Sequence, residues 1–224
     1  MSKHLQRDLD TLQRDILSLA GLVEHAIHKA MKSLMDRNAL MAQEVILGDD
    51  QIDQQEIHVD EECLKILALH QPVAIDLRRI TSAMMIVIDL ERLGDLAEEI
   101  AQQSLKLSQL NFTGVPPKLQ KLSDLATLLV RNSLDGFVQI DVELARVVIR
   151  LQKQADHLVD EIMESIEAAM AGGGEAISPG LCLHTVTKAL SRIADHATNI
   201  AEDVIYLAEG EIVKHQRHNL RRLA

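Results

Sequence analysis

The chain has 224 residues, enough for one large domain or two small ones with a continuous hydrophobic core. It contains no tryptophan, one tyrosine and two phenylalanines, so the core must be aliphatic, and the abundant Leu, Ala and Met are good helix formers. The net charge of −11 disfavours a general affinity for nucleic acid or anionic lipid, which both need a basic surface, and permits hard cations and basic protein surfaces as binding partners.

Apolar residues recur at helical spacing through the first half of the chain and predict three long helices. These span about residues 5–36, 39–70 and 73–107. Gly48-Asp49-Asp50 is a point where the second helix could end and a new segment be capped. Gln71-Pro72 predicts a turn, because Pro is tolerated in the first turn of the helix that follows.

Residues 111–117, which include Gly114 and the pair Pro116-Pro117, form the linker-like stretch in the middle of the chain. The helical pattern then restarts and predicts helices over 118–139, 141–171 and about 178–208. Ser178-Pro179 predicts the start of the last helix, with Ser as the N-cap and Pro at the first helical position.

The second half of the chain repeats the first. Asp53 aligns with Asp156 at an offset of 103 residues, and Asp95 aligns with Asp195 at an offset of 100. The difference falls in the loop between the second and third helices of each unit, where a change of length costs little. We therefore predict an all-α fold of tandem duplicated three-helix bundles, with six long helices and a pseudo-twofold axis. The expected units are residues 1–110 and 117–213, followed by a basic tail, 214–224, which is either a solvated end or a contact for an acidic partner.

Acidic and amide side chains recur four residues apart in both units. Glu91, Asp95 and Glu99 share one side of a helix, as do Asp195 and Asn199, because residues at i and i+4 are neighbours on a helix. If the second and third helices pack antiparallel, side chains from different helices reach one level. This count pairs Asp53 with Glu91, Asp49 with Asp95 and Asp156 with Asp195, and adds Glu24 of the first helix.

Two interpretations of these acids stay open. They are either the wet outer face of a bundle or a cation site, and their recurrence at one height in both units favours the site. Carboxylate and amide oxygens suit Mg²⁺, Ca²⁺, Mn²⁺ or iron.

A di-iron oxidase is excluded, because none of the ten histidines follows a Glu by three residues. His196 could add a nitrogen ligand, although its counterpart Leu96 favours a packing role. Arg78-Arg79 is either an anion site or, as we expect, a pair on the helix surface.

Cys63 and Cys182 stand far apart, without C-x-x-C spacing and among apolar residues, so we expect buried thiols in a reducing cytosol. No signal peptide is visible, and the longest clean apolar run, residues 83–88, is far shorter than the ~20 residues of a membrane span. We expect a soluble cytoplasmic protein.

Several motifs, spread over the whole chain, resemble the PhoU family of phosphate-uptake regulators. In the first half these are Gln71-Pro72-Val73-Ala74, Asp76-Leu77-Arg78 and Glu91-Arg92-Leu93-Gly94-Asp95. In the second half they are Ser191-Arg192-Ile193-Ala194-Asp195-His196-Ala197-Thr198-Asn199-Ile200-Ala201-Glu202-Asp203 and Glu209-Gly210-Glu211-Ile212-Val213. The signature occurs twice, and that repetition makes it specific.

The resemblance implies a cytoplasmic, non-enzymatic and often homodimeric adaptor that negatively regulates phosphate uptake and the phosphate-starvation response. It implies contacts with the ATPase of the phosphate ABC transporter and with the phosphate sensor histidine kinase, so that the protein is peripheral to the membrane only through these partners. The alternatives are a metal-storage or metal-dependent hydrolytic bundle and a purely structural scaffold.

The resemblance also implies metal clusters of iron, or of another divalent metal such as magnesium, manganese or zinc, on the acidic motifs. The sequence departs from the family motif at Ser191, where an acid is expected, and at Leu96, where His is expected, so the second site would need Asp156, Asp160 or Asp203 to complete its ligands. The candidate metal ligands are Glu91, Asp95, Glu99, Asp195, Asn199, Glu202, Asp49, Asp53 and Asp156.

Overall fold

The computed structural model describes residues 3–111 and 114–213. Its helices are α1 (Lys3–Met35), α2 (Ala39–His70), α3 (Ala74–Ser108), α4 (Pro117–Gln139), α5 (Val142–Met170) and α6 (Ile177–Glu209), with a short 3-10 turn, η1 (Gly174–Ala176), before α6. The predicted all-α fold of six long helices is confirmed. The predicted basic tail, 214–224, lies outside the described residues, as do residues 112 and 113 of the linker.

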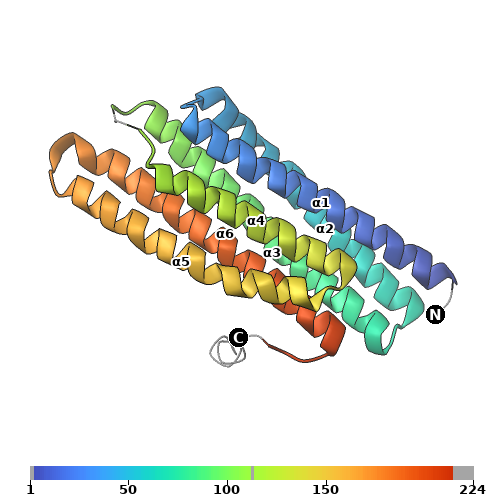
Figure 1. Cartoon of the computed structure of the whole chain (residues 1–224). Helices are drawn as coiled ribbons and strands as arrows, with labels where there is room; N and C mark the ends of the chain where they lie inside the picture. The colour runs from blue at the N-terminus through green and yellow to red at the C-terminus, as the bar shows by residue number, and fades with distance from the viewer. Residues whose placement is uncertain (1–2, 112–113, 214–224) are drawn as a thin grey trace.

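The helices run side by side along one long axis, and the two halves of the chain use the same packing scheme (Figure 1). In the first half α1 packs on α2 and α3, and α2 packs on α3; in the second half α4, α5 and α6 repeat these three contacts. The halves join mainly through α3 and α6, with a smaller contact between α1 and α4. Asp89 of α3 contacts Asn199 while Glu99 contacts Arg192, so α3 and α6 run antiparallel, as a pseudo-twofold axis between them requires.

The turn between the first two helices of each unit shows the duplication in detail. Arg37 and Ile140 both adopt left-handed backbone conformations, with φ of 52° and 53°. Asn38 and Asp141, which follow them, are the N-caps of α2 and α5, and each side chain accepts a hydrogen bond from the backbone N–H three residues on, at 3.1 and 3.0 Å. Matching caps start the second helix of each unit at an equivalent residue.

The structure corrects three predicted helix ends. The helix α2 is continuous through Gly48, because packing on α1 and α3 outweighs the roughly 1 kcal/mol that Gly costs inside a helix. Ser178 is not an N-cap: η1 runs directly into α6, so Ala176 takes the N-cap position without a side-chain hydrogen bond and Pro179 lies within the first turn. Pro117 belongs to α4 as its first residue rather than to the linker.

The core is aliphatic and continues across both units. Its most deeply buried large residues are Leu and Ile, and they come from α1, α3, α4, α5 and α6. Cys63 and Cys182 are free and buried, as predicted. Within residues 3–111 and 114–213, no helix combines the length and the apolar character that a membrane crossing needs.

Candidate functional site

Six carboxylates gather where α2 packs on α3, and we call them the acidic face. Gly94 permits this packing, since a Cβ atom there would lie 3.0 Å from Cγ2 of Ile52 and 3.4 Å from an oxygen of Asp49. The close approach of the two helices brings the side chains of α2 and α3 to common levels. The acidic face consists of Asp49, Asp53 and Glu56 of α2 and Glu91, Asp95 and Glu98 of α3.

The charges of the acidic face act on one another. Burial raises the pKa of Asp49 to about 6, and the negative charges of Asp53, Glu98, Asp95 and Glu91 add to this shift. Asp49 and Asp95 therefore lie at a similar height on the paired helices α2 and α3, as predicted.

Glu91 responds to its surroundings in the same direction. Burial first, and then the charge of Asp95, raises the pKa of Glu91, while the neighbouring Arg92 opposes the shift. Asp53 also contributes to the shift, which agrees with its predicted level beside Glu91.

Arg92 is the cation that lies against this face. Its Nη1 atom is 3.2 Å from Asp95 and its Nε atom 3.4 Å from Glu91. The guanidinium is exposed, so these ion pairs are screened by water and contribute little to stability. The acidic face thus retains a strong negative potential.

The acidic face fits a loosely held, hydrated cation better than a preformed metal cluster. In the described part of the chain, no three His, Cys, Asp or Glu side chains converge on a point where they could hold a metal ion. Mg²⁺ keeps several of its waters and is commonly bound through one or two carboxylates. Burial, and then the repulsion of neighbouring carboxylates, raises the pKa of Asp49, and such a cation would relieve the repulsion.

The equivalent place in the second unit has a different chemistry. Gln152 occupies the position of Asp49, and its side-chain amide donates to Asp195 at 3.0 Å and to Asp156 at 3.3 Å. Thr198 in turn donates to the carbonyl oxygen of Gln152 at 3.4 Å. Asp156 and Asp195 meet as predicted, but Oδ1 of each already accepts a hydrogen bond from the Gln152 amide between them, so this set fits an amide bridge better than a metal ion.

Three predicted ligands lie away from both groups. Glu99 faces α6 and lies 4.0 Å from Arg192, and Asn199 faces α3 across the seam between the units. Glu202 is buried in the interior. Glu24, expected at the height of the acids, pairs with Arg131 of α4 at 3.3 Å. The rotation of each helix turns these side chains away from both groups.

A polar network that the sequence did not reveal lies on the α3–α6 seam. Asp89 is 8% exposed and accepts hydrogen bonds from Nδ1 of His196 at 2.7 Å and from the amide of Asn199 at 3.2 Å. His196 is therefore a bonding partner across the seam rather than a simple packing residue. The available signal was an Asp inside the apolar run of residues 86–90, since a polar residue at a core-facing helical position needs a partner.

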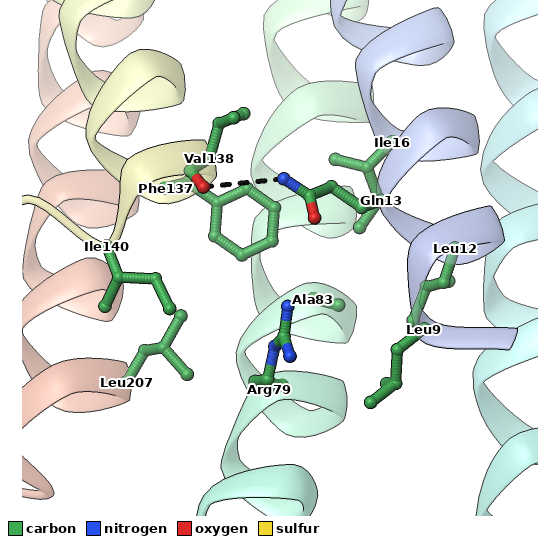
Figure 2. A pocket seen from close by; sticks show the side chains of 10 residues that line it. All are labelled: Leu9, Leu12, Gln13, Ile16, Arg79, Ala83, Phe137, Val138, Ile140 and Leu207. Carbon is green, nitrogen blue, oxygen red and sulfur yellow. Dashed lines mark hydrogen bonds between the residues drawn. The ribbon is translucent and has the colours of Figure 1, made fainter. Parts of the chain in front are cut away.

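A small cavity lies on the same seam, between α1, α3, α4 and α6 (Figure 2). Gln13 closes one side by donating to the carbonyl of Val138 at 3.5 Å, and the side chain of Arg79 points towards the cavity from α3. Its volume of about 30 Å³ admits one or two waters, far below the several hundred Å³ of a ligand pocket. The remaining lining residues are Leu9, Leu12, Ile16, Ala83, Phe137, Ile140 and Leu207.

Comparisons with known proteins agree with the division of the chain into two similar units. The family model described as PhoU domain matches residues 16–104 and again residues 119–204. The phosphate-specific transport system accessory protein PhoU homolog of Pseudomonas aeruginosa is 36% identical over 219 residues, covering 96% of this chain and 89% of the relative.

Two crystal structures share the fold over nearly their whole length. PhoU from Pseudomonas aeruginosa superimposes with a TM-score of 0.86 at 36% identity, covering 92% of this chain and 99% of the other. The phosphate transport system regulatory protein PhoU from Streptococcus pneumoniae does so with a TM-score of 0.88 at 28% identity, covering 94% and 99%.

Proposed function

Because the chain belongs to the PhoU family, we propose that it is a cytoplasmic, non-enzymatic adaptor that represses phosphate uptake and the phosphate-starvation response. The observation that carries this proposal is the match of the family model to both units, together with relatives named accessory proteins of the phosphate-specific transport system. A regulatory role in phosphate transport follows from the family. The sign of the regulation and the contacts below are finer parts of the proposal.

The partners in this proposal are the ATPase of the phosphate ABC transporter and the phosphate sensor histidine kinase. A rigid bundle can bring two such proteins together through separate helix faces, and a change in its affinity for one partner would report phosphate status. Mixing the purified chain with each partner and measuring binding by surface plasmon resonance tests this. Binding to neither partner would refute the adaptor role.

The regulatory sign is tested by deleting the gene and assaying alkaline phosphatase in cells grown with abundant phosphate. Loss of a repressor should give high alkaline phosphatase activity, and the intact gene on a plasmid should restore repression. A plasmid that encodes a variant changed far from the acidic face, such as Asp124→Asn on α4, is the control for the effect of a substitution as such. It should restore repression as well as the unchanged gene does. Unchanged repression in the deletion strain would contradict the proposal.

We also propose that the acidic face binds a divalent cation through one or two carboxylates, with waters as the remaining ligands. The mutual repulsion around Asp49 supports this, as does the lack of a neutralising amide of the kind that Gln152 supplies in the second unit. Calorimetric titration with Mg²⁺ and Mn²⁺ should show binding that is lost in Asp49→Asn/Asp95→Asn and retained in Asp156→Asn. Equal binding by both variants would place the cation elsewhere.

The competing function is a metal-storage or metal-dependent hydrolytic bundle. Metal analysis of the purified protein for iron, manganese and zinc, combined with a phosphatase assay, separates it from the adaptor. Turnover that falls in Asp95→Ala would favour the hydrolase, and many metal ions per chain would favour storage. The adaptor hypothesis predicts neither result.

We also propose that the protein is a homodimer. Light scattering in solution measures its oligomeric state.

A further inference from the structure

Among residues 3–111 and 114–213, no helix packs over one broad face of the bundle. The helices α2, α3, α6 and α5 are neighbours in that order, and α1 and α4 pack over one side of this layer. Figure 1 shows α1 and α4 in front of the other helices and running along the same long axis. We call the opposite side of the layer the open face. The acidic face lies on it, at the junction of α2 and α3.

An apolar strip continues the acidic face towards the α2–α3 turn. Ile57 and Leu64 of α2 are 55% and 56% exposed, and Leu77 and Ile88 of α3 are 40% and 52% exposed. The contact between Ile52 and the backbone of Gly94 fixes the antiparallel register, so that Ile57 lies near the level of Ile88. Exposed aliphatic residues that adjoin carboxylates only partly neutralised by Arg92 suit an occupant that is both basic and apolar.

The chain itself carries such a segment. Residues 214–224 hold four formal positive charges and no acid, and two leucines stand three residues apart among them. By composition this segment complements the open face in charge and in apolar character. The charged residues are Lys214, Arg217, Arg221 and Arg222, and the leucines are Leu220 and Leu223.

The described chain ends where this segment can reach the open face. The end of α6 and the α2–α3 turn lie at the same end of the molecule (Figure 1). Gly210, at the end of α6, packs against the guanidinium of Arg78 in the second turn of α3, and Val213 is buried. Eleven further residues span up to about 36 Å when extended, whereas Asp95 lies only ~26 Å along α3 from Arg78.

The opposite side of the molecule is a poor alternative for a basic segment. The open groove between α1 and α4 is lined by Lys32, Arg131 and His28, by one acid, Asp124, and by an exposed Leu128, so its formal charges are two positive and one negative. It offers apolar surface but adds like charges, which repel a basic segment. Charge therefore favours the open face over this groove as the place for a basic segment.

We propose that residues 214–224 dock in cis on the open face, with Leu220 and Leu223 on the apolar strip and the arginines beside the acidic face. The docked segment neutralises the acidic face and competes there with any cation or basic partner. This inference rests on charge, register and reach, so it stands or falls separately from the proposed adaptor function.

Disulfide cross-linking in the full chain tests the docking. The variant Ile88→Cys/Leu220→Cys places one thiol on the apolar strip and one in the segment, and Leu128→Cys/Leu220→Cys is the matched control on the α1–α4 groove. The native thiols do not interfere, because Cys63 and Cys182 are buried and burial raises the pKa of both. Under mild oxidation, the first variant should form its intramolecular disulfide roughly tenfold faster than the control.

Two further measurements separate docking from chance encounter. The cross-linking rate should fall at high salt, and it should fall when Glu91→Gln/Asp95→Asn is added but not when Asp124→Asn is added. Circular dichroism verifies that all variants are folded. Equal rates at Ile88→Cys and Leu128→Cys, or a rate insensitive to salt, would overturn the proposal. A disulfide between two chains would identify a second copy as the occupant and would equally overturn docking in cis.

Discussion

The two units share one scaffold but treat the same place on it in opposite ways. In the first unit Asp49 lies across from Asp95, and burial, together with the charges of neighbouring carboxylates, raises the pKa of Asp49 to about 6. In the second unit Gln152 stands in place of Asp49 and donates to Asp195 at 3.0 Å. A single change from acid to amide converts a repulsive pair into a hydrogen-bonded one.

The difference extends over the whole acidic face. Four of its six positions carry a neutral residue in the second unit, namely Gln152, Val159, Ser191 and Thr198. The duplication therefore preserves packing, caps and register, while the charge has been concentrated on one unit. Function that depends on charge is expected in the first unit, and the second unit serves as its internal control.

The largest effect is expected where the helices of the first unit approach most closely. Gly94→Val should lower the free energy of unfolding by about 2–3 kcal/mol, because even a Cβ atom there lies 3.0 Å from Ile52. Denaturant unfolding measures this loss. Gly48→Ala on α2 has open space around its Cβ and should instead stabilise the protein by up to ~1 kcal/mol. A neutral Gly94→Val would mean that α2 can move away from α3 at no cost.

The seam between the units comes next. Asp89→Ala removes the acceptor that His196 and Asn199 share, and should cost about 2 kcal/mol because two partly buried donors lose their partner. Asp89→Asn keeps one oxygen acceptor and should recover part of this loss. Thermal unfolding of both variants measures the difference. A cost equal to that of an exposed Asp→Ala change would show that the network does not hold the units together.

Exchanging the two chemistries tests the comparison directly. Asp49→Gln should raise the free energy of unfolding at neutral pH by about 1 kcal/mol, a figure discounted for the partial exposure of the carboxylate. Gln152→Asp should lower it by a similar amount, because it places a second carboxylate beside Asp195. Shifts of the same sign in both variants would contradict the interpretation of the two sites as opposites.

The smallest expected effect is the change with pH in the stability difference between Asp49→Gln and the unchanged protein. The folded-state pKa of Asp49, about 6, lies above its ordinary value of 3.8, so the folded protein binds this proton more tightly than the unfolded chain. Stability from this group is therefore present at low pH and is lost as the pH rises from about 4 to 6. The advantage of Asp49→Gln should grow over this window and vanish below it. An advantage that is constant with pH would exclude electrostatic repulsion as its cause.

The sequence was sufficient for the fold because the fold depends on spacing. Helical periodicity, the turn at Gln71-Pro72 and the repeat offsets were enough to predict six helices and the levels at which Asp49 meets Asp95. These features follow from counting residues along helices of known rise.

The candidate site was predicted less completely because it depends on rotation. Glu99 and Asn199 stand one turn beyond Asp95 and Asp195, but they point to the seam rather than to α2 or α5. Which side of α3 faces α6 is decided by packing between units more than a hundred residues apart. Periodicity within one helix carries no information about that choice. For the same reason the hydrogen-bonding role of Asp89 was not predicted, because its partners lie on the other unit.

The joining of the units through α3 and α6 has a consequence for each half alone. Each central helix fills the core of its own unit on one side and that of the neighbouring unit on the other. A half-length chain, residues 1–110, would leave aliphatic surface on α3 exposed to water, and burying that surface favours association. Since the pseudo-twofold seam already suits two similar surfaces, such half-chains should pair as symmetric dimers, which would re-create the arrangement that preceded the duplication.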